Sequence, residues 1–240
     1  MGRNGIQHIG AAALLLAVCV LIFGAVRYNL SAASAAMASM PLTVVIDAGH
    51  GGEDGGATGI TGASESRLNL EIALRLDRLA AFCGLQTCMV RTTDTAIYSE
   101  GCETYSEKKI SDLKNRVELI NQSRPAVLVS IHQNHFPQEK YAGAMVFYAK
   151  SDGSRELGNL MQAQLRAALN PQNNRECRKA DSIYLLEKIS CPGVLVECGF
   201  LSNGREEALL QQPDYQKKIV CAITGALTLY TEKGEQDVEI

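Results

Sequence analysis

Two histidines and two glutamates of this 240-residue chain lie where apolar, strand-like segments end or where a helical segment begins. Three apolar segments end at or shortly before His50, His132 and Glu197, and the helical segment begins at Glu65. The carboxyl ends of parallel strands meet at one edge of a sheet, so these side chains should converge there. Two imidazoles and one carboxylate form a zinc ligand set that leaves a fourth position for water, and a second carboxylate can take a proton from that water. The sequence therefore indicates a zinc-type hydrolytic site, with the division of roles between the two glutamates open.

Each of these residues also has an ordinary structural explanation when it is considered alone. A histidine in a polar turn is usually solvated, a histidine at a strand end usually makes a hydrogen bond, and an acid at a helix start interacts with the helix dipole. Glu197 is the exception, because an ionised carboxylate after "GVLV" is costly to bury without a cation or a metal. Four such residues at one predicted edge favour a metal site over four separate explanations.

The loop around His50, "VVIDAGHGGEDGGATG" (44–59), is rich in glycine, which permits close approach of the backbone to a ligand. It lacks the Gly-Lys-Ser/Thr ending of a phosphate-binding loop. Asp54 also stands where the dinucleotide-binding spacing that starts at Gly49 requires its last glycine. The loop is therefore better interpreted as the frame of a metal ligand than as a phosphate site.

Apolar β-type segments alternate with helical periods along the chain, which is typical of a mostly parallel, twisted sheet with helices on both faces. We expect one α/β domain of this kind, with the zinc site at the C-terminal rim of the strands. The expected strands are 42–47, 85–90, 126–132, 143–149, 183–189 and 193–198, and the expected helices are 65–82, 107–122, 152–169, 204–211 and 213–230. For the helix over 65–82, Ser64 is the expected N-cap and Gly84 the stop signal.

The N-terminal segment predicts an exported protein. Residues 9–26 are eighteen residues without a charge, so residues 1–27 are interpreted as a membrane anchor or an uncleaved signal, although Ala-x-Ala sites ending at Ala35 and Ala38 leave cleavage open. Residues 28–41 form a linker, 42–231 the catalytic domain and 232–240 a polar tail. The net charge of −3, without a basic cluster, excludes a nucleic-acid partner. The eight cysteines contain no C-x-x-C pair, and their redox state stays open.

Four motifs in order resemble those of the zinc-dependent N-acetylmuramoyl-L-alanine amidases of the amidase-3 family. They are "VIDAGHGGEDGGATG", the downstream Glu65, "SIHQN" (130–134) and "VLVECGFLSN" (194–203), and the resemblance covers about residues 42 to 230. It implies that His50, Glu65 and His132 hold Zn²⁺ and that Glu197 is the catalytic acid/base. The implied reaction is hydrolysis of the amide between the lactyl group of N-acetylmuramic acid and L-alanine in peptidoglycan.

Further segments, "YSEKKISDLKNRVELIN" (105–121), "SIYLLEKISCPGVLVECGFLSN" (182–203) and "LYTEKG" (229–234), resemble the germination-specific amidases of endospore formers. This resemblance implies a role in forming muramic δ-lactam in spore cortex, a downstream deacetylase, a regulatory protein and a place in the forespore envelope. Two alternatives remain at this point. One is a membrane-tethered zinc carboxypeptidase acting on stem peptides, and the other is a non-catalytic wall-binding scaffold with the same fold.

Five other residues near the motifs are weaker candidates. Asp47 and Asp54 could orient the histidines, and Asn134 and His135 could contact substrate. His135 also offers a third imidazole, so a ligand set of three histidines is a further alternative. Cys198 follows Glu197 directly, but the alternation of a strand points it to the opposite face, where it should be packed in the core.

Overall fold

The computed structural model describes residues 18–28, 42–123 and 125–236 of the chain. The chain divides into two compact units, Met1–Pro41 and Leu42–Ile240. In the first unit residues 18–28 are helical. None of the helices in the described ranges has the length and apolar character needed to cross a membrane. Of the predicted span over 9–26, residues 9–17 lie outside the described residues, as do residues 29–41 of the predicted linker.

The second unit is built on a six-stranded sheet with the strand order β2-β1-β3-β6-β4-β5. All neighbouring strands are parallel except β4 and β6. The central strands consist largely of β-branched and aliphatic residues, as expected for strands that are covered on both faces. The strands are β1 (Thr43–Ala48), β2 (Gln86–Met89), β3 (Ala126–Asn134), β4 (Met145–Tyr148), β5 (Arg178–Lys179) and β6 (Gly193–Phe200). The predicted fold class is therefore confirmed.

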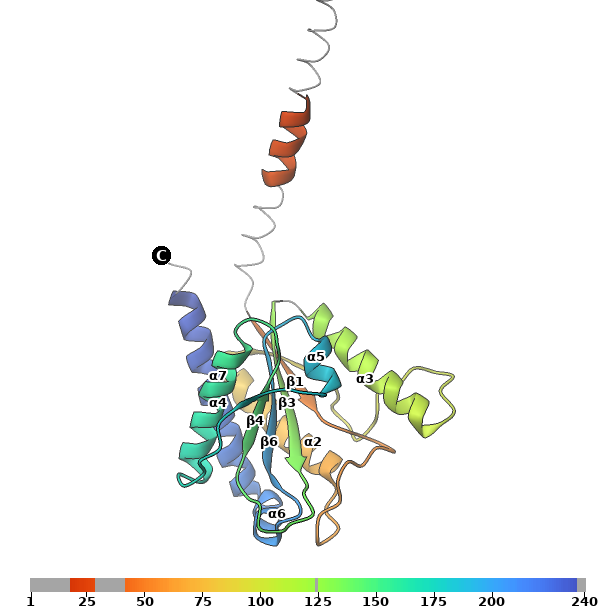
Figure 1. Ribbon diagram of the computed structural model, residues 1–240, viewed down its shortest axis with the longest axis vertical. Helices are drawn as coiled ribbons and strands as arrows, with labels where there is room; N and C mark the ends of the chain where they lie inside the picture. Colours follow the sequence, from red (N-terminus) through yellow and green to blue (C-terminus); the bar gives the residue numbers. More distant parts are fainter. Residues whose placement is uncertain (1–17, 29–41, 124, 237–240) are drawn as a thin grey trace, which may run out of the picture. The chain divides into compact units, whose positions relative to one another are not determined.

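Helices cover both faces of the sheet (Figure 1). One face is covered by α2 (Glu65–Phe82), α4 (Ser154–Leu169) and α7 (Pro213–Gln236), and the other by α3 (Tyr105–Gln122) and α5 (Tyr184–Lys188). The short helix α6 (Gly204–Leu210) follows β6 closely. The sheet is therefore buried between two helical layers, which leaves the ends of its strands as the places where polar side chains can gather.

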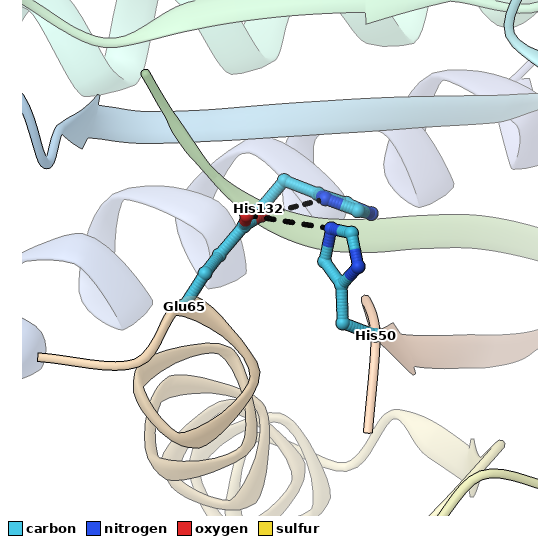
Figure 2. A group of neighbouring side chains, drawn as sticks. All are labelled: His50, Glu65 and His132. Carbon is cyan, nitrogen blue, oxygen red and sulfur yellow. Dashed lines mark hydrogen bonds and ion pairs between the residues drawn. The ribbon is translucent and has the colours of Figure 1, made fainter. Parts of the chain in front are cut away.

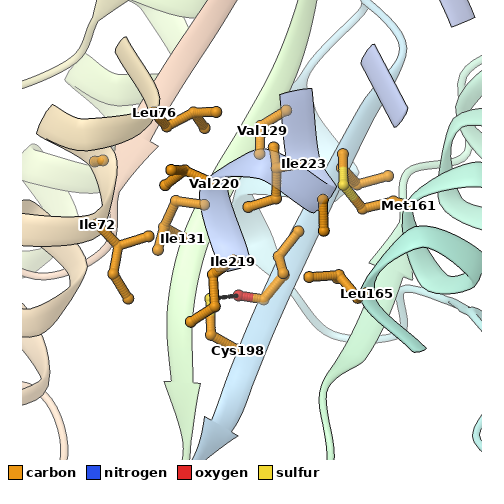
Figure 3. Close-up of a cluster of buried hydrophobic side chains, with 14 of the residues drawn as sticks. Ile72, Leu76, Val129, Ile131, Met161, Leu165, Cys198, Ile219, Val220 and Ile223 are labelled. Atoms are coloured by element: carbon orange, nitrogen blue, oxygen red, sulfur yellow. Dashed lines mark hydrogen bonds between the residues drawn. The ribbon is translucent and has the colours of Figure 1, made fainter. Parts of the chain in front are cut away.

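Strand alternation distributes the core between the two faces. Figure 3 shows Ile72 of α2, Met161 of α4 and Ile223 of α7 in one buried cluster with Val129 and Ile131 of β3. The smaller core on the opposite face contains residues of the other parity, among them Val45, Leu128 and Leu195. Cys198 has the parity of the larger core and is 1% exposed, so the prediction that it is packed is confirmed.

The predicted strand over 183–189 is wrong, because these residues contain the helix α5. Leu185 and Leu186 are adjacent and both are buried in the smaller core, whereas a strand would point them to opposite faces. The edge strand of this region is instead β5, two residues long and paired with β4. The pattern of a short apolar segment is the same for a strand and for a buried helical turn. Here the segment is a helical turn that packs against α3.

The N-termini of α2 and α3 are held in different ways. The helix α3 begins two residues before the predicted position, because Thr104 and Glu107 form a capping box. Ser64 is the N-cap residue of α2, as predicted, but its hydroxyl does not bond the helix N–H groups. It donates to the carbonyl of Gly55 instead, at 3.1 Å. The cap of α2 thus ties the start of the helix to the glycine-rich loop.

Candidate metal centre

The parallel strands bring His50, Glu65 and His132 together at the C-terminal rim of the sheet (Figure 2). His50 follows the end of β1, His132 lies near the end of β3, and Glu65 is the first residue of α2. The Nε2 atom of His50 is 3.3 Å from Oε2 of Glu65, and Nδ1 of His132 is 3.0 Å from Oε1. The two imidazole rings are edge to face, with centroids 5.1 Å apart. One donor atom from each residue lies within 4.8 Å of the others, a spacing that can hold a metal ion.

The charge state of Glu65 suits a metal ligand. Burial raises the pKa of Glu65, but hydrogen bonds and charge from His132 and His50 outweigh burial and hold the pKa well below its ordinary range. The carboxylate is therefore ionised, as metal coordination requires. Two nitrogen donors and one carboxylate are the donor set of a catalytic zinc site with an open fourth position.

Glu65 is also held in place by the surrounding chain. Its Oε2 accepts a hydrogen bond from the backbone N–H of Ala57 at 2.8 Å, and its Oε1 accepts one from the N–H of Gln133 at 3.2 Å. The side chain of Asn69, one turn further along α2, donates to the carbonyl of Gly49 at 3.1 Å. These bonds fix the carboxylate between the loop that carries His50 and the strand that carries His132.

Two glycines let the loop close against the site. A Cβ atom on Gly49 would overlap the ring of His132, and a Cβ atom on Gly56 would lie 2.6 Å from Oε2 of Glu65. Gly56 has a φ of +66° and His50 itself has a φ of 62°, and the loop also has positive φ at Gly51 and Gly52. The glycine-rich sequence is thus required by the close approach of the backbone to the proposed ligands.

Substitution of Gly49 by alanine tests this packing. Gly49 does not have a positive φ, so alanine suits its backbone, and the expected damage comes from the overlap with His132. We expect activity to fall by about 100-fold or more, because a displacement of about 1 Å at a catalytic group costs that much. The measurement is the initial rate of amide hydrolysis, together with the thermal midpoint.

Gly55→Ala is the matched control in the same loop. A Cβ atom there would lie 3.7 Å from the hydroxyl of Ser64, which is an ordinary contact, so its rate should stay near that of the parent chain. Equal rates for Gly49→Ala and the parent chain would show that the ring of His132 does not need this space.

Two buried arginines that sequence patterns did not reveal hold the backbone around His50. The guanidinium of Arg116 donates to the carbonyls of Ala48 and His50 at 2.9 and 2.7 Å. The guanidinium of Arg91 donates to the carbonyls of Ala48 and Gly49 at 2.8 and 3.0 Å. Both arginines are at most 3% exposed. These hydrogen bonds satisfy backbone carbonyls at the end of β1 and in the loop that follows it. They so fix the position of His50.

Asp47 supports the site by a different route from the one predicted. One carboxylate oxygen bonds Arg116, and the other accepts a hydrogen bond from Ser130 at 2.6 Å, so neither is left for an imidazole. Burial raises the pKa of Asp47, but the charge of Arg116 and the bond from Ser130 outweigh burial and hold the pKa below its ordinary value. Asp47 therefore acts on His50 through Arg116.

Replacement of Arg116 by methionine should strongly destabilise the fold. It leaves Asp47 ionised and buried without its cation, and it removes donors from two carbonyls. Breaking a buried ion pair in this way costs about 3–5 kcal/mol, which we expect as the loss in the free energy of unfolding. Urea denaturation at pH 7 measures it.

The pH dependence of this loss in the free energy of unfolding distinguishes the effect of the ion pair from the effect of lost packing. Because the pKa of Asp47 is lower in the folded state, its stabilising contribution is complete above the ordinary value of 3.8 and is lost as the pH falls below that value. The difference between the parent chain and Arg116→Met should therefore shrink as the pH falls, because burial without the arginine raises the pKa of Asp47 in the variant, and it should be smallest below about pH 3.8. A difference that stays constant across this range would assign the loss to packing alone.

Glu197 lies beside the cluster on β6, where its Cα atom is the strand partner of His132. The pKa of Glu197 is raised to about 7: burial is the largest cause, the charges of His132 and His50 act to lower the pKa, and the nearby charge of Glu65 acts to raise it. Its Oε2 atom is buried and has no hydrogen-bond partner within the described part of the chain. An unpartnered, buried carboxylate oxygen next to three potential ligands is free to bond a water or a substrate.

Asp54 contacts a histidine, as the sequence suggested. Its Oδ1 lies 3.0 Å from Nδ1 of His50, and its Oδ2 lies 3.2 Å from Nζ of Lys109. Burial lowers the pKa of His50, but hydrogen bonds and charge from Glu65 and Asp54 outweigh burial and raise it. Asp54 is therefore placed to orient the His50 ring.

The two residues after the "SIHQ" segment lie at the end of β3 and beyond it. Asn134 is its last residue and accepts a backbone hydrogen bond from Leu201 at 2.8 Å. His135 is exposed in the following loop. Among the described residues, the group with metal-ligand spacing consists of His50, Glu65 and His132, so the structure does not bring His135 into it.

Comparisons with known proteins agree with this arrangement. The Amidase_3 family model, described as N-acetylmuramoyl-L-alanine amidase, matches residues 44–229. A germination-specific N-acetylmuramoyl-L-alanine amidase of Bacillus subtilis is 39% identical over 202 residues, which are 82% of this chain and 84% of that protein.

Solved structures show the same fold. The CwlD amidase of Clostridioides difficile, determined in complex with the GerS lipoprotein, superimposes with a TM-score of 0.76 and 42% identity, covering 80% of this chain and 98% of that one. An N-acetylmuramoyl-L-alanine amidase of Clostridium difficile 630 superimposes with a TM-score of 0.71 and 31% identity, covering 81% and 98%. The family match spans most of the chain and includes all four rim residues, so this chain belongs to the Amidase_3 family of N-acetylmuramoyl-L-alanine amidases.

Proposed function

We propose that this chain is a zinc-dependent amidase that hydrolyses the bond between the lactyl group of N-acetylmuramic acid and L-alanine in peptidoglycan. The observation that carries the proposal is the cluster of His50, Glu65 and His132 beside the unpartnered oxygen of Glu197. Zinc is the proposed ion because two imidazoles and one carboxylate are a zinc donor set with an open position. When bound, zinc supplies Lewis acidity, which acidifies water and polarises a carbonyl oxygen.

Glu197 is the proposed acid/base. Its pKa is raised to about 7, chiefly by burial, and a neighbouring divalent cation would favour the ionised form, so the residue starts as a base. It takes a proton from the water that attacks the lactyl carbonyl, and it then gives that proton to the departing amine of L-alanine. The products are a free lactyl carboxylate and a stem peptide with a new amino terminus.

End-group analysis tests the reaction against its rivals. Digestion of peptidoglycan with the full chain should release stem peptides whose new amino terminus is L-alanine. A carboxypeptidase would release single C-terminal amino acids, and a scaffold protein would release nothing. Either of these two results would reject the amidase assignment.

We further propose that the substrate is the peptidoglycan of the spore cortex. The support is the 39% identity to an amidase named germination-specific and the likeness to a structure named as CwlD. Removal of the stem peptide exposes the lactyl carboxylate, and a downstream deacetylase would free the amine with which that carboxylate closes a δ-lactam. Spores that lack this chain should contain no muramic δ-lactam, and a normal δ-lactam content would contradict the proposal.

Two further parts of the proposal concern partners and location. The related CwlD structure contains a lipoprotein, so we propose that a lipoprotein-type regulator binds this chain as well. Residues 1–27 are proposed to hold the catalytic domain outside the cytoplasmic membrane, in the forespore envelope. Carbonate extraction of membranes should leave the full chain bound and release a variant without residues 1–27, and release of both forms would reject the anchor.

A further inference from the structure

A polar hollow opens next to the catalytic rim, on the β4 side of the sheet. Its volume is about 680 Å³, and most of its wall is formed by the segment 170–178, which contributes three asparagines and two arginines. A second hollow of about 290 Å³ adjoins it, because both are lined by Glu176 and Cys177. The second hollow adds Arg155 and Arg166 of α4. The two together form a continuous polar surface outside the metal cluster.

The charge of this surface is opposite to that of the protein. Four arginines and one glutamate are the charged residues in its lining, while the whole chain has a net charge of −3. Arg166 is only partly satisfied. One Nη atom donates to the carbonyl of Arg175 at 2.6 Å, but its Nε is buried and has no partner within the described residues. A concave surface of this kind favours an anionic ligand.

Backbone contacts connect the hollow to Glu197. The strand neighbour of Glu197 on β4 is Met145. The segment before Met145 is bound to the wall of the hollow, since Asn173 donates to the carbonyl of Ala144 at 2.8 Å and Arg175 donates to that of Ala142 at 3.2 Å.

A row of aromatic rings also connects the hollow with the strand that carries Glu197. The guanidinium of Arg175 lies 5.2 Å from the ring of Phe200, three residues after Glu197 on the same strand. The ring of Tyr141 stacks on Phe200, and the exposed Phe136 contacts Tyr141 edge to face. The hollow is therefore bonded to the rim through both backbone and aromatic contacts.

We propose that this arginine-lined hollow binds the carboxylates of the stem peptide, and so places the peptide side of the scissile amide next to Glu197. This inference rests on the proposed function and specifies which part of its substrate lies where. The N-acetylated glycan is neutral, whereas the stem peptide carries the free carboxylates of D-glutamate and of its C-terminal residue. Arginine binds carboxylates through a planar pair of donors, which suits the exposed Arg178 in the wall of the larger hollow.

The test is the variant Arg178→Ala of the full chain. Two muropeptide substrates are compared, one with free stem-peptide carboxylates and one in which they are amidated. The loss of a charge-assisted contact should raise KM for the free carboxylate substrate about tenfold, with kcat within about twofold, and should leave KM for the amidated substrate unchanged. Arg78→Ala, which removes an exposed arginine from α2, is the matched control for loss of charge alone.

Equal effects on both substrates, or no effect on either, would overturn the proposal. A binding measurement keeps this result separate from failure of the proposed reaction. The free tripeptide L-Ala-D-γ-Glu-diaminopimelate, titrated into the ¹⁵N-labelled full chain, should shift amide resonances of 170–178, and Arg178→Ala should weaken that binding about tenfold. Resonance shifts confined to other regions would reject the hollow as the peptide site even if the chain is an active amidase.

Discussion

Replacement of Glu197 by glutamine should lower kcat for amide hydrolysis by about 10²–10⁴-fold while the chain still binds one metal ion, because loss of a general acid/base costs about this much. Glutamine fills the same space on β6 and can still form hydrogen bonds, but it cannot accept the proton of the attacking water. The three proposed metal ligands lie in the loop after β1, on β3 and on α2, and are left unchanged. Single-turnover rates and metal content, measured on the same preparation, separate chemistry from binding.

A matched control for this variant is Glu139→Gln. Glu139 is an exposed glutamate in the loop after β3, so the same chemical change there should alter kcat by less than about twofold, as expected for a surface site away from functional features. If Glu197→Gln keeps the parent kcat, another group must transfer the proton. If it loses its metal instead, Glu197 belongs to the ligand set and the division of roles proposed here is wrong.

Replacement of His132 by alanine should abolish both metal binding and activity. Loss of a neighbour that merely orients a ligand already costs 10- to 100-fold in metal affinity, so loss of a direct ligand should cost more than about 100-fold. Isothermal titration of the metal-free chain with zinc measures the affinity. The matched control is His135→Ala, three residues further along, where the exposed imidazole lies outside the cluster, and this variant should bind zinc as the parent chain does.

The comparison of these two histidine variants also decides between the ligand sets. Equal loss of affinity in both variants would favour the set of three histidines that the sequence left open. Retention of full affinity in His132→Ala would remove the cluster of His50, Glu65 and His132 as the zinc site. Because both substitutions truncate the same side chain, differences in surface charge or helix propensity cannot explain either result.

The rim residues could be predicted from sequence because their position depends on local signals. A polar residue near the carboxyl end of an apolar strand in a parallel sheet lies close to one edge of that sheet, and His132 and Glu197 stand two and three residues before the ends of β3 and β6. The start of α2 at Glu65 was equally readable, since the helical period and Ser64 mark it. The parallel pairing of the neighbouring strands β1, β3 and β6 then brings His50, His132 and Glu197 to the same edge.

The supporting residues could not be predicted in this way. Arg91 and Arg116 bond carbonyls 42 to 68 positions away in the sequence, and nothing in their own segments distinguishes them from surface arginines. The helix α5 was missed because its two buried leucines match a strand segment until the packing partner is known. The arginine-lined hollow depends on an irregular segment without periodicity, so only the fold reveals which side chains share its wall.

The most direct test of the central claim combines metal content and bond cleavage in one preparation of the full chain. Bound zinc is quantified, a chelator removes it, zinc is added back, and new L-alanine amino termini from peptidoglycan are counted at each step. The metal centre proposed here predicts one zinc ion per chain, with termini that appear with zinc, stop after chelation and return on addition. Cleavage at the full rate by the metal-free chain, or cleavage by a chain that binds no zinc, would contradict it.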